Sequence, residues 1–284
     1  MKRNFTLNTN KIFGLKYSFF ILLYLIISVV FSGVLLAFNG NNFVITLLSP
    51  LGYSIAILLV IYTQNKLTNT TFKLIKKPNF SIKFTLLAVC LSVGMFFGLG
   101  GINFKFAEFL QGLNIKVSSV SLDLSSLKNY ILYSLMLCVV PAVMEELFFR
   151  RFLIDNISGN HIVISLIVGL LFGLYHAALS QLIYQLICGF FLTMLALKSK
   201  SVLPCVLAHF LNNFFVITFE FFGVIIDFYS WKIVSIGLFF LVAFMVAIFI
   251  DKERVKGKGN YLQMIGYSSV GIAFLVVLIV AGCF

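Results

Sequence analysis

The sequence has few charged residues. Asp, Glu, Lys and Arg make up only 11% of its 284 residues, whereas 61% are hydrophobic. A soluble domain is typically about a quarter charged, so this chain has too little polar surface to cover a soluble fold. A membrane-spanning helix needs about 20 apolar residues, and the length therefore allows several spans with short loops. We expect a single integral membrane domain over residues 1–284, without a separate soluble domain.

Several motifs of known chemistry are also missing. The five cysteines are scattered along apolar stretches without CxxC or paired spacing, which argues against a disulfide framework or a thiolate zinc site. There is no GxSxG motif, so a serine nucleophile has no obvious candidate. All four aspartates (Asp123, Asp155, Asp227 and Asp251) lie outside the apolar runs, which removes a mechanism based on two intramembrane aspartates.

Long apolar runs predict the membrane spans. They lie near residues 17–38, 43–62, 84–100, 129–152, 162–179, 181–197, 202–222, 232–250 and 262–283. The pattern predicts an all-α fold, a polytopic membrane helix bundle with about 8–9 transmembrane helices. N-terminal spans at 17–100 and C-terminal spans at 232–283 flank a core at about 129–222. Residues 101–128 are expected to form an interfacial helix followed by a flexible loop.

The positive charges predict the orientation of these spans. With alternate loops on opposite sides, all but four of the 21 Lys and Arg residues fall on one side, the exceptions being Lys105, Lys116, Lys128 and Lys232. The positive-inside rule then places the amino terminus in the cytoplasm, and we expect a plasma-membrane protein. A net charge of +12 in a soluble protein would raise nucleic acid as a partner. In a membrane protein it fits anionic lipid, so we expect contact with the bilayer and none with nucleic acid.

A few polar side chains lie inside the spans. Ionisable groups in a bilayer cost at least about 2.5 kcal/mol each on insertion scales, so they tend to be kept for function or pairing. The fourth span contains Glu145 and Glu146, the fifth His176, and the seventh His209 with Asn213 one turn later. Three spans thus bring polar groups into one apolar region, as a buried site requires.

Helical spacing gives the two glutamates different surroundings. Glu145 and Glu146 are adjacent and therefore point about 100° apart. Glu146 shares a face with Arg150 one turn later, which predicts an ion pair between them and leaves Glu145 facing elsewhere. A single His or Asn in a span is often only a hydrogen-bonding link between helices. The two glutamates are harder to explain in this way, because one arginine balances only one of them.

Three motifs follow one another on these spans. Glu145-Glu146-Leu-Phe-Phe-Arg150 fits EExxxR, Phe172-Gly-Leu-Tyr-His176 fits FxxxH, and His209-Phe-Leu-Asn-Asn213 fits HxxxN. Together they resemble the CPBP family, the CAAX protease and bacteriocin-processing family of intramembrane proteases, whose eukaryotic members cleave prenylated CAAX proteins. The resemblance covers roughly residues 129–222.

The resemblance implies an endopeptidase that hydrolyses a peptide bond in a membrane-bound protein or peptide substrate. Glu145 would activate water, His176 would hold that water, and His209 with Asn213 would stabilise the oxyanion. Glu146, Arg150 and Phe172 would have structural or positioning roles.

Three questions stay open at this level. The mechanism either needs no cofactor or uses a divalent metal such as zinc, held by Glu145, His176 and His209; the absence of HExxH slightly favours the metal-free version. Intramembrane Glu and His also occur in transporters and proton-coupled carriers, although no inverted repeat is evident here. A catalytically inactive immunity or scaffold protein is the third reading.

Overall fold

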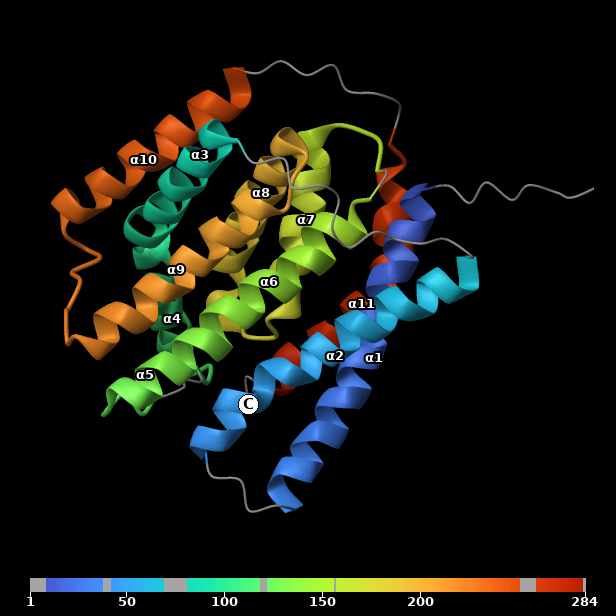
Figure 1. Cartoon of the computed structure of the whole chain (residues 1–284), viewed down its shortest axis with the longest axis horizontal. Coiled ribbons are helices and arrows are strands. Elements are labelled where there is room, and N and C mark those ends of the chain that lie inside the picture. Colours follow the sequence, from blue (N-terminus) through green and yellow to red (C-terminus); the bar gives the residue numbers. More distant parts are fainter. Residues whose placement is uncertain are drawn as a thin grey trace, which may run out of the picture.

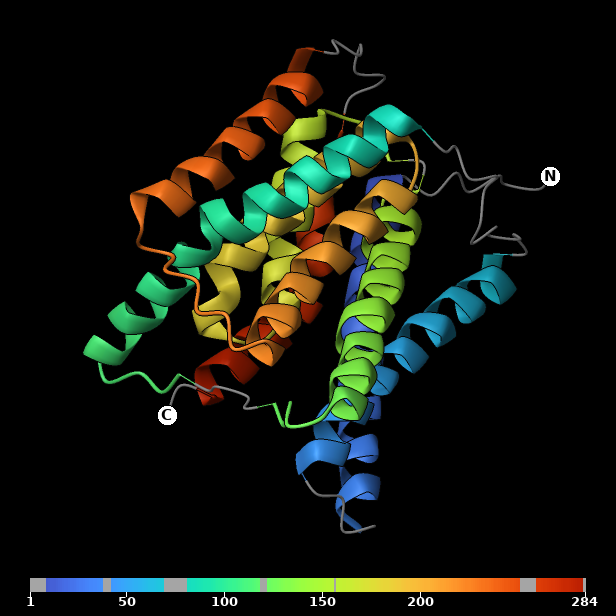
Figure 2. The same cartoon turned by 60° about the vertical axis from the view of Figure 1, so that its left-hand side comes forward.

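The computed structural model describes residues 9–37, 42–68, 81–117, 122–155, 157–250 and 259–282. These residues form helices and include no strand, and the helices pack as a bundle of tilted rods (Figures 1 and 2). Eight helices in the described ranges are long and apolar enough to cross a membrane. The predicted all-α membrane bundle is therefore confirmed.

The helices follow the predicted spans closely. In chain order they are α1 (Thr9–Ala37), α2 (Asn42–Thr68), α3 (Ile82–Val93), α4 (Gly100–Gly112), α5 (Leu127–Tyr133), α6 (Val140–Glu146), α7 (His161–Tyr175), α8 (Leu182–Ser199), α9 (Leu203–Phe221), α10 (Trp231–Ile250) and α11 (Tyr261–Ala281). Three π-helical segments occur in the described residues. Gly94–Leu99 joins α3 to α4, Ser134–Val139 joins α5 to α6, and Leu147–Leu153 extends α6. Such wide turns are rare and often occur at functional sites.

The expected interfacial helix after residue 100 is instead the end of a longer one. Helices α3 and α4 form one continuous apolar helix from Ile82 to Gly112. The glycines in this stretch do not end it, because they serve close packing: a Cβ on Gly98 would lie 2.9 Å from the backbone of Gly237 in α10. Of the flexible loop expected after it, residues 118–121 lie outside the described residues.

Helix α7 is shorter than its predicted span. It ends at Tyr175, with Ala177 in the left-handed region at φ 50°. Its 15 residues extend only ~22 Å, which is less than the ~30 Å hydrocarbon core. The turn at 176–181 contains neither Gly nor Pro, so the sequence does not mark where the helix ends. His176 therefore lies at a helix end, inside the thickness of the bundle.

Glycines allow α7 and α8 to form a close hairpin. A Cβ on Gly169 would lie 2.7 Å from the Leu186 carbonyl oxygen, and a Cβ on Gly189 would lie 2.9 Å from the Gly169 Cα. Small residues of this kind let membrane helices approach closely. The hairpin packs beside α9 and the π-helical end of α6, so the three motif-bearing segments meet at the centre of the bundle.

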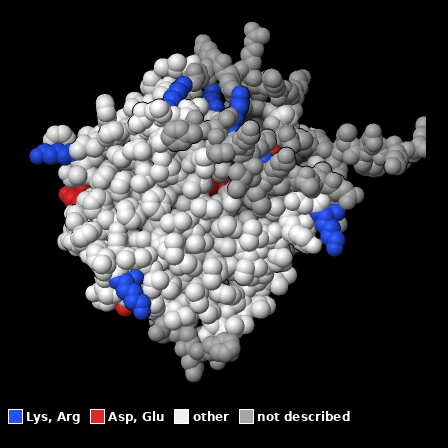
Figure 3. Space-filling view, in the orientation of Figure 1, with Lys and Arg blue, Asp and Glu red and all other residues white. Residues whose placement is uncertain are grey.

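The surface agrees with a membrane setting. One face of the molecule shows a broad uncharged area, with the visible Lys and Arg side chains towards its edges (Figure 3). Many of the basic residues that predict the orientation, including those at 73–77 and 252–258, lie outside the described residues. The cytoplasmic amino terminus and the plasma-membrane location therefore stay predictions.

Candidate active site

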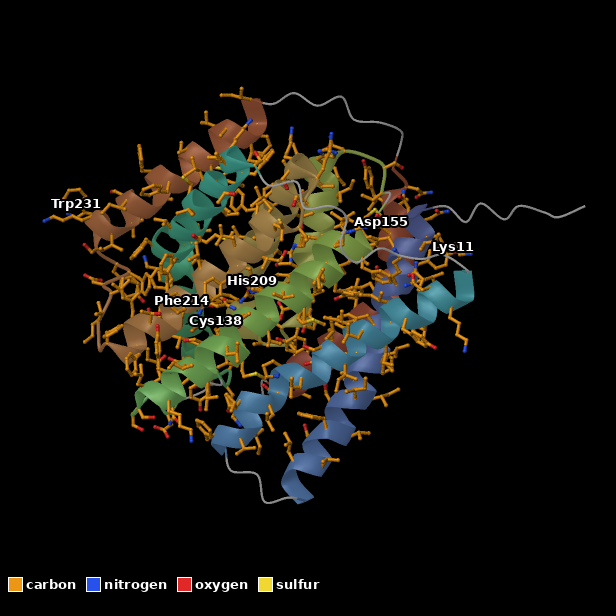
Figure 4. All side chains as sticks on the ribbon, in the orientation of Figure 1. Lys11, Cys138, Asp155, His209, Phe214 and Trp231 are labelled. Atoms are coloured by element: carbon orange, nitrogen blue, oxygen red, sulfur yellow. The ribbon has the colours of Figure 1, made fainter. Side chains whose placement is uncertain are left out.

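The site is built around Glu146, which contacts two other motif residues. Its Oε1 atom lies 3.0 Å from Nη1 of Arg150 and 2.9 Å from Nδ1 of His209, and all three residues are buried. The predicted pair of Glu146 with Arg150 is therefore present. The contact with His209 joins the fourth span to α9, and sequence spacing did not predict it. Figure 4 labels His209 near the middle of the bundle.

Arg150 fixes this group to the hairpin. Its Nη2 atom donates a hydrogen bond to the Gly189 carbonyl oxygen at 3.2 Å. Its guanidinium lies over the ring of Phe172, 4.3 Å from the centroid, a favourable cation–π geometry. One arginine thus holds a carboxylate on its own helix, a carbonyl on α8 and an aromatic ring on α7.

Phe172 also brings the two histidines together. Its ring centroid lies 4.7 Å from that of His176 and 6.0 Å from that of His209, both in edge-to-face contact. Because both imidazoles touch one phenyl ring, they lie within about two helical turns of each other. His176 is held in addition by its Nδ1 atom, 2.8 Å from the Phe172 carbonyl oxygen.

Glu145 differs from its neighbour. It is 5% exposed and forms no hydrogen bond or ion pair with the described residues, whereas Glu146 lacks a partner only at Oε2. It is close enough to His209 and Arg150 to interact with them electrostatically, and the same holds for a cluster of phenols. These are Tyr24, Tyr53 and Tyr175. The phenols come from α1, α2 and α7, and sequence reasoning missed them because tyrosine is common in membrane helices.

Asn213 and its neighbour Asn212 follow His209 on α9. The Nδ2 atom of Asn213 donates to the Leu137 carbonyl oxygen at 3.3 Å, and its Oδ1 accepts from Asn212 at 3.5 Å. Asn212 in turn accepts a hydrogen bond from the Tyr184 hydroxyl at 2.8 Å. The HxxxN pattern pointed to Asn213 alone, yet Asn212 is the more buried of the two, at 8% exposed.

A small cavity lies beside His209. It measures about 10 Å³ and its polar lining comes from Gln185, His209, Asn212 and Asn213. A cavity of about this size holds a single water molecule when it offers polar partners.

A second, larger cavity of about 400 Å³ shares Gln185, Asn212 and Asn213 with the small one. It extends along α9 to Glu220 and the loop that follows. Two of the four predicted catalytic residues thus line these cavities, whereas Glu145 and His176 line neither. Glu220 also lies in the wall of the larger one.

A zinc ion would require Glu145, His176 and His209 to surround one point. In the described part of the chain, no group of three or more His, Cys, Asp or Glu side chains is arranged to hold a metal ion. The Nδ1 atoms of His176 and His209 are occupied by a backbone carbonyl and by Glu146, respectively. These hydrogen bonds leave Nε2 of each histidine available, as in many histidines that bind zinc. What argues against a zinc site is that Glu145, His176 and His209 are not gathered into a three-ligand group in the described residues.

Comparison with known proteins identifies the segment that carries the site. Residues 127–215 match the family model described as type II CAAX prenyl endopeptidase Rce1-like. No curated protein and no solved structure gives a significant match to the chain. The matched segment contains all three motifs, EExxxR, FxxxH and HxxxN, and the helices whose side chains meet around Glu146. Over this segment, which is less than a third of the chain, the protein is similar to the Rce1-like CAAX prenyl endopeptidases.

Proposed function

We propose that this protein is an intramembrane endopeptidase in which Glu145 activates a water molecule to hydrolyse a peptide bond in a membrane-associated protein or peptide. Glu145 takes a proton from the water as it attacks the scissile carbonyl. The same carboxylic acid then gives the proton to the leaving amine. His176, His209 and Asn213 position the water and stabilise the negative charge that forms on the carbonyl oxygen.

The observation that carries the proposal is the contrast between the two glutamates. Each glutamate has one buried oxygen without a hydrogen-bond partner among the described residues, but Glu146 is engaged through its other oxygen by Arg150 and His209, whereas Glu145 forms no hydrogen bond or ion pair there. A buried carboxylate without a partner is unfavourable for stability. Function explains why it is there, and catalytic hydrogen bonds often tighten only when substrate is bound.

The hydrogen-bond partners of the histidines support separate roles for them. A carbonyl and a carboxylate only accept, so Nδ1 of His176 donates to Phe172 and Nδ1 of His209 donates to Glu146. The Nε2 atom of neutral His176 is then left as an acceptor, which suits holding the attacking water. For His209 to donate to an oxyanion as well, its Nε2 atom must also carry a proton.

The test is the substitution Glu145→Gln, which keeps the shape of the side chain but removes the base. We expect turnover to fall by about 10²- to 10⁴-fold because the base is lost. The variant should still insert into the membrane and bind substrate. His209→Ala and Asn213→Ala should each lower turnover by about 10²- to 10³-fold. Cleavage products are identified by comparing the membrane peptidomes of cells that express the wild type or the Glu145→Gln variant.

Two results would overturn the proposal or part of it. Unimpaired cleavage by Glu145→Gln would reject the glutamate base and return the transporter or scaffold reading to first place. The alternative zinc mechanism is tested by measuring the zinc content of the purified protein and by assaying its activity after exhaustive chelation. Stoichiometric zinc, with activity lost on chelation and restored by zinc, would replace the metal-free mechanism.

A further inference from the structure

We propose that the larger cavity binds an extended segment of the peptide substrate through the side-chain amides in its wall, and that Glu220 at its mouth selects a basic residue in that segment. This inference rests on the proposed peptidase function, and it adds where the substrate binds and by which chemistry. At about 400 Å³, the cavity falls within the range of about 300 to 1,000 Å³ that is usual for ligand pockets.

The wall of the cavity contains five carboxamide side chains among apolar and aromatic residues. They are Asn103, Gln181, Gln185, Asn212 and Asn213. They come from α4, from the turn before α8, from α8 and from α9, and α8 contacts both α4 and α9. A carboxamide carries an acceptor oxygen and a donor NH₂. Peptide units in an extended chain offer the complementary groups.

Several of these amides are not satisfied within the protein. The Oδ1 atom of Asn103 is buried without a hydrogen-bond partner in the described residues. The side chains of Gln181 and Gln185 likewise have no protein partner there. A hydrocarbon chain would leave these groups unpaired, which is unfavourable. A peptide backbone pairs donors and acceptors along its length, and this favours a peptide over a lipid tail as the occupant.

The mouth of the cavity adds a charge preference. Glu220 is exposed near the end of α9, lines the cavity, and has no ion-pair partner in the described chain. Its carboxylate favours a Lys or Arg side chain on the bound segment. Glu108 at the same end of the molecule accepts a hydrogen bond from the Tyr229 hydroxyl at 2.8 Å and does not line the cavity. It therefore provides a matched control.

The cavity also leads to the site. It shares Gln185, Asn212 and Asn213 with the one-water cavity beside His209. A segment bound in the larger cavity would therefore run towards the water and His209. This continuity makes the larger cavity a part of the substrate path rather than an isolated hollow.

The experiment measures binding separately from hydrolysis. The Glu145→Gln protein in lipid nanodiscs is incubated with a library of short random-sequence synthetic peptides, and the retained peptides are identified by mass spectrometry. Adding Asn103→Leu or Gln185→Met should lower retention about three- to tenfold, the usual size for a lost hydrogen bond. Adding Glu220→Gln should reduce the enrichment of Lys and Arg about two- to fivefold, whereas Glu108→Gln should leave it unchanged.

Thermal unfolding of each variant verifies that it is folded, and Gln185→Met, which keeps the side-chain length, stands in if Asn103→Leu is unstable. Retention that is the same in folded Asn103→Leu and Gln185→Met proteins, or co-purification of lipid without peptide, would overturn the inference. The retained peptides are then offered to the wild-type protein. Peptides that bind but are not cleaved would reject the peptidase function and leave the binding site standing. Cleavage at an unchanged rate in the Asn103→Leu and Gln185→Met proteins would reject the binding site and leave the peptidase function standing.

Discussion

At the scale of single residues, Glu146 is the connecting element of the site. Sequence spacing predicts its pairing with Arg150, because four residues along an α-helix return to the same face. The same oxygen also holds His209, 63 residues away in the chain. Arg150 therefore positions a histidine that it does not itself contact in the described structure, through the carboxylate between them.

This arrangement predicts a structural role for Arg150. Arg150→Gln should lower the free energy of unfolding by about 3 to 5 kcal/mol, because it leaves a buried carboxylate without its cation. Glu146→Gln should likewise impair folding, and activity should fall in both because the site residues are misplaced. Thermal unfolding in detergent measures the stability.

Arg151→Gln provides the matched control for Arg150→Gln. Arg151 pairs with Asp155 at 2.7 Å, but these side chains are 13% and 22% exposed, so the loss should be at most about 1 kcal/mol. Lost activity in Arg150→Gln with an unchanged unfolding temperature would contradict a structural role. Arg150 would then be assigned to substrate contact.

At the scale of helices, the α7–α8 hairpin determines where the site residues lie. Gly169 and Gly189 let the two helices touch, and the Gly189 carbonyl accepts a hydrogen bond from Arg150. The hydrophobic runs predicted these helices and the near-absence of a polar loop between them. They did not predict that α7 ends at Tyr175, because the turn at 176–181 has no Gly or Pro.

Enlarging the hairpin contact should separate the two helices. Gly189→Leu places a side chain where a Cβ alone would lie 2.9 Å from Gly169. We expect it to lower stability by about 1 to 3 kcal/mol and to lower activity, because the Arg150 contact moves. Gly266→Leu on α11 is the control, since nothing lies within 4 Å of a Cβ there. Equal unfolding temperatures for the two variants would show that the close contact is not needed.

At the scale of the whole molecule, the orientation in the membrane decides from which side the larger cavity is entered. Glu220 and the loop after α9 lie on the side that holds few basic residues. With the amino terminus in the cytoplasm, as the positive charges predict, the mouth of this cavity faces the outside.

Cysteine labelling tests this orientation. A membrane-impermeant maleimide added to intact cells should label Asp227→Cys in the loop after α9 but not Lys66→Cys at the end of α2. Inverted membrane vesicles should give the opposite pattern. The unsubstituted protein measures background from the native cysteines, of which Cys138, Cys188 and Cys205 are buried. Labelling of Lys66→Cys from outside would reverse the predicted orientation and place the mouth of the cavity in the cytoplasm.

The sequence by itself determined what depends on local order and composition. The scarcity of charge requires a membrane protein, the apolar runs predict the helices, and the spacing of Glu146 and Arg150 predicts their pair. The motifs indicate the family that the match at residues 127–215 bears out. The single domain over residues 1–284 and the catalytic roles of Glu145, His176, His209 and Asn213 stay predictions.

Only the tertiary structure decided which helices turn which face towards one another. In a membrane helix the lipid-facing side and the packed side are both apolar, so the hydrophobic pattern does not tell them apart. The contact of Glu146 with His209, the position of Phe172 between two histidines and the amide-lined cavity all depend on the rotation and tilt of neighbouring helices. These follow from close packing between distant segments, which the periodicity of a single helix does not contain.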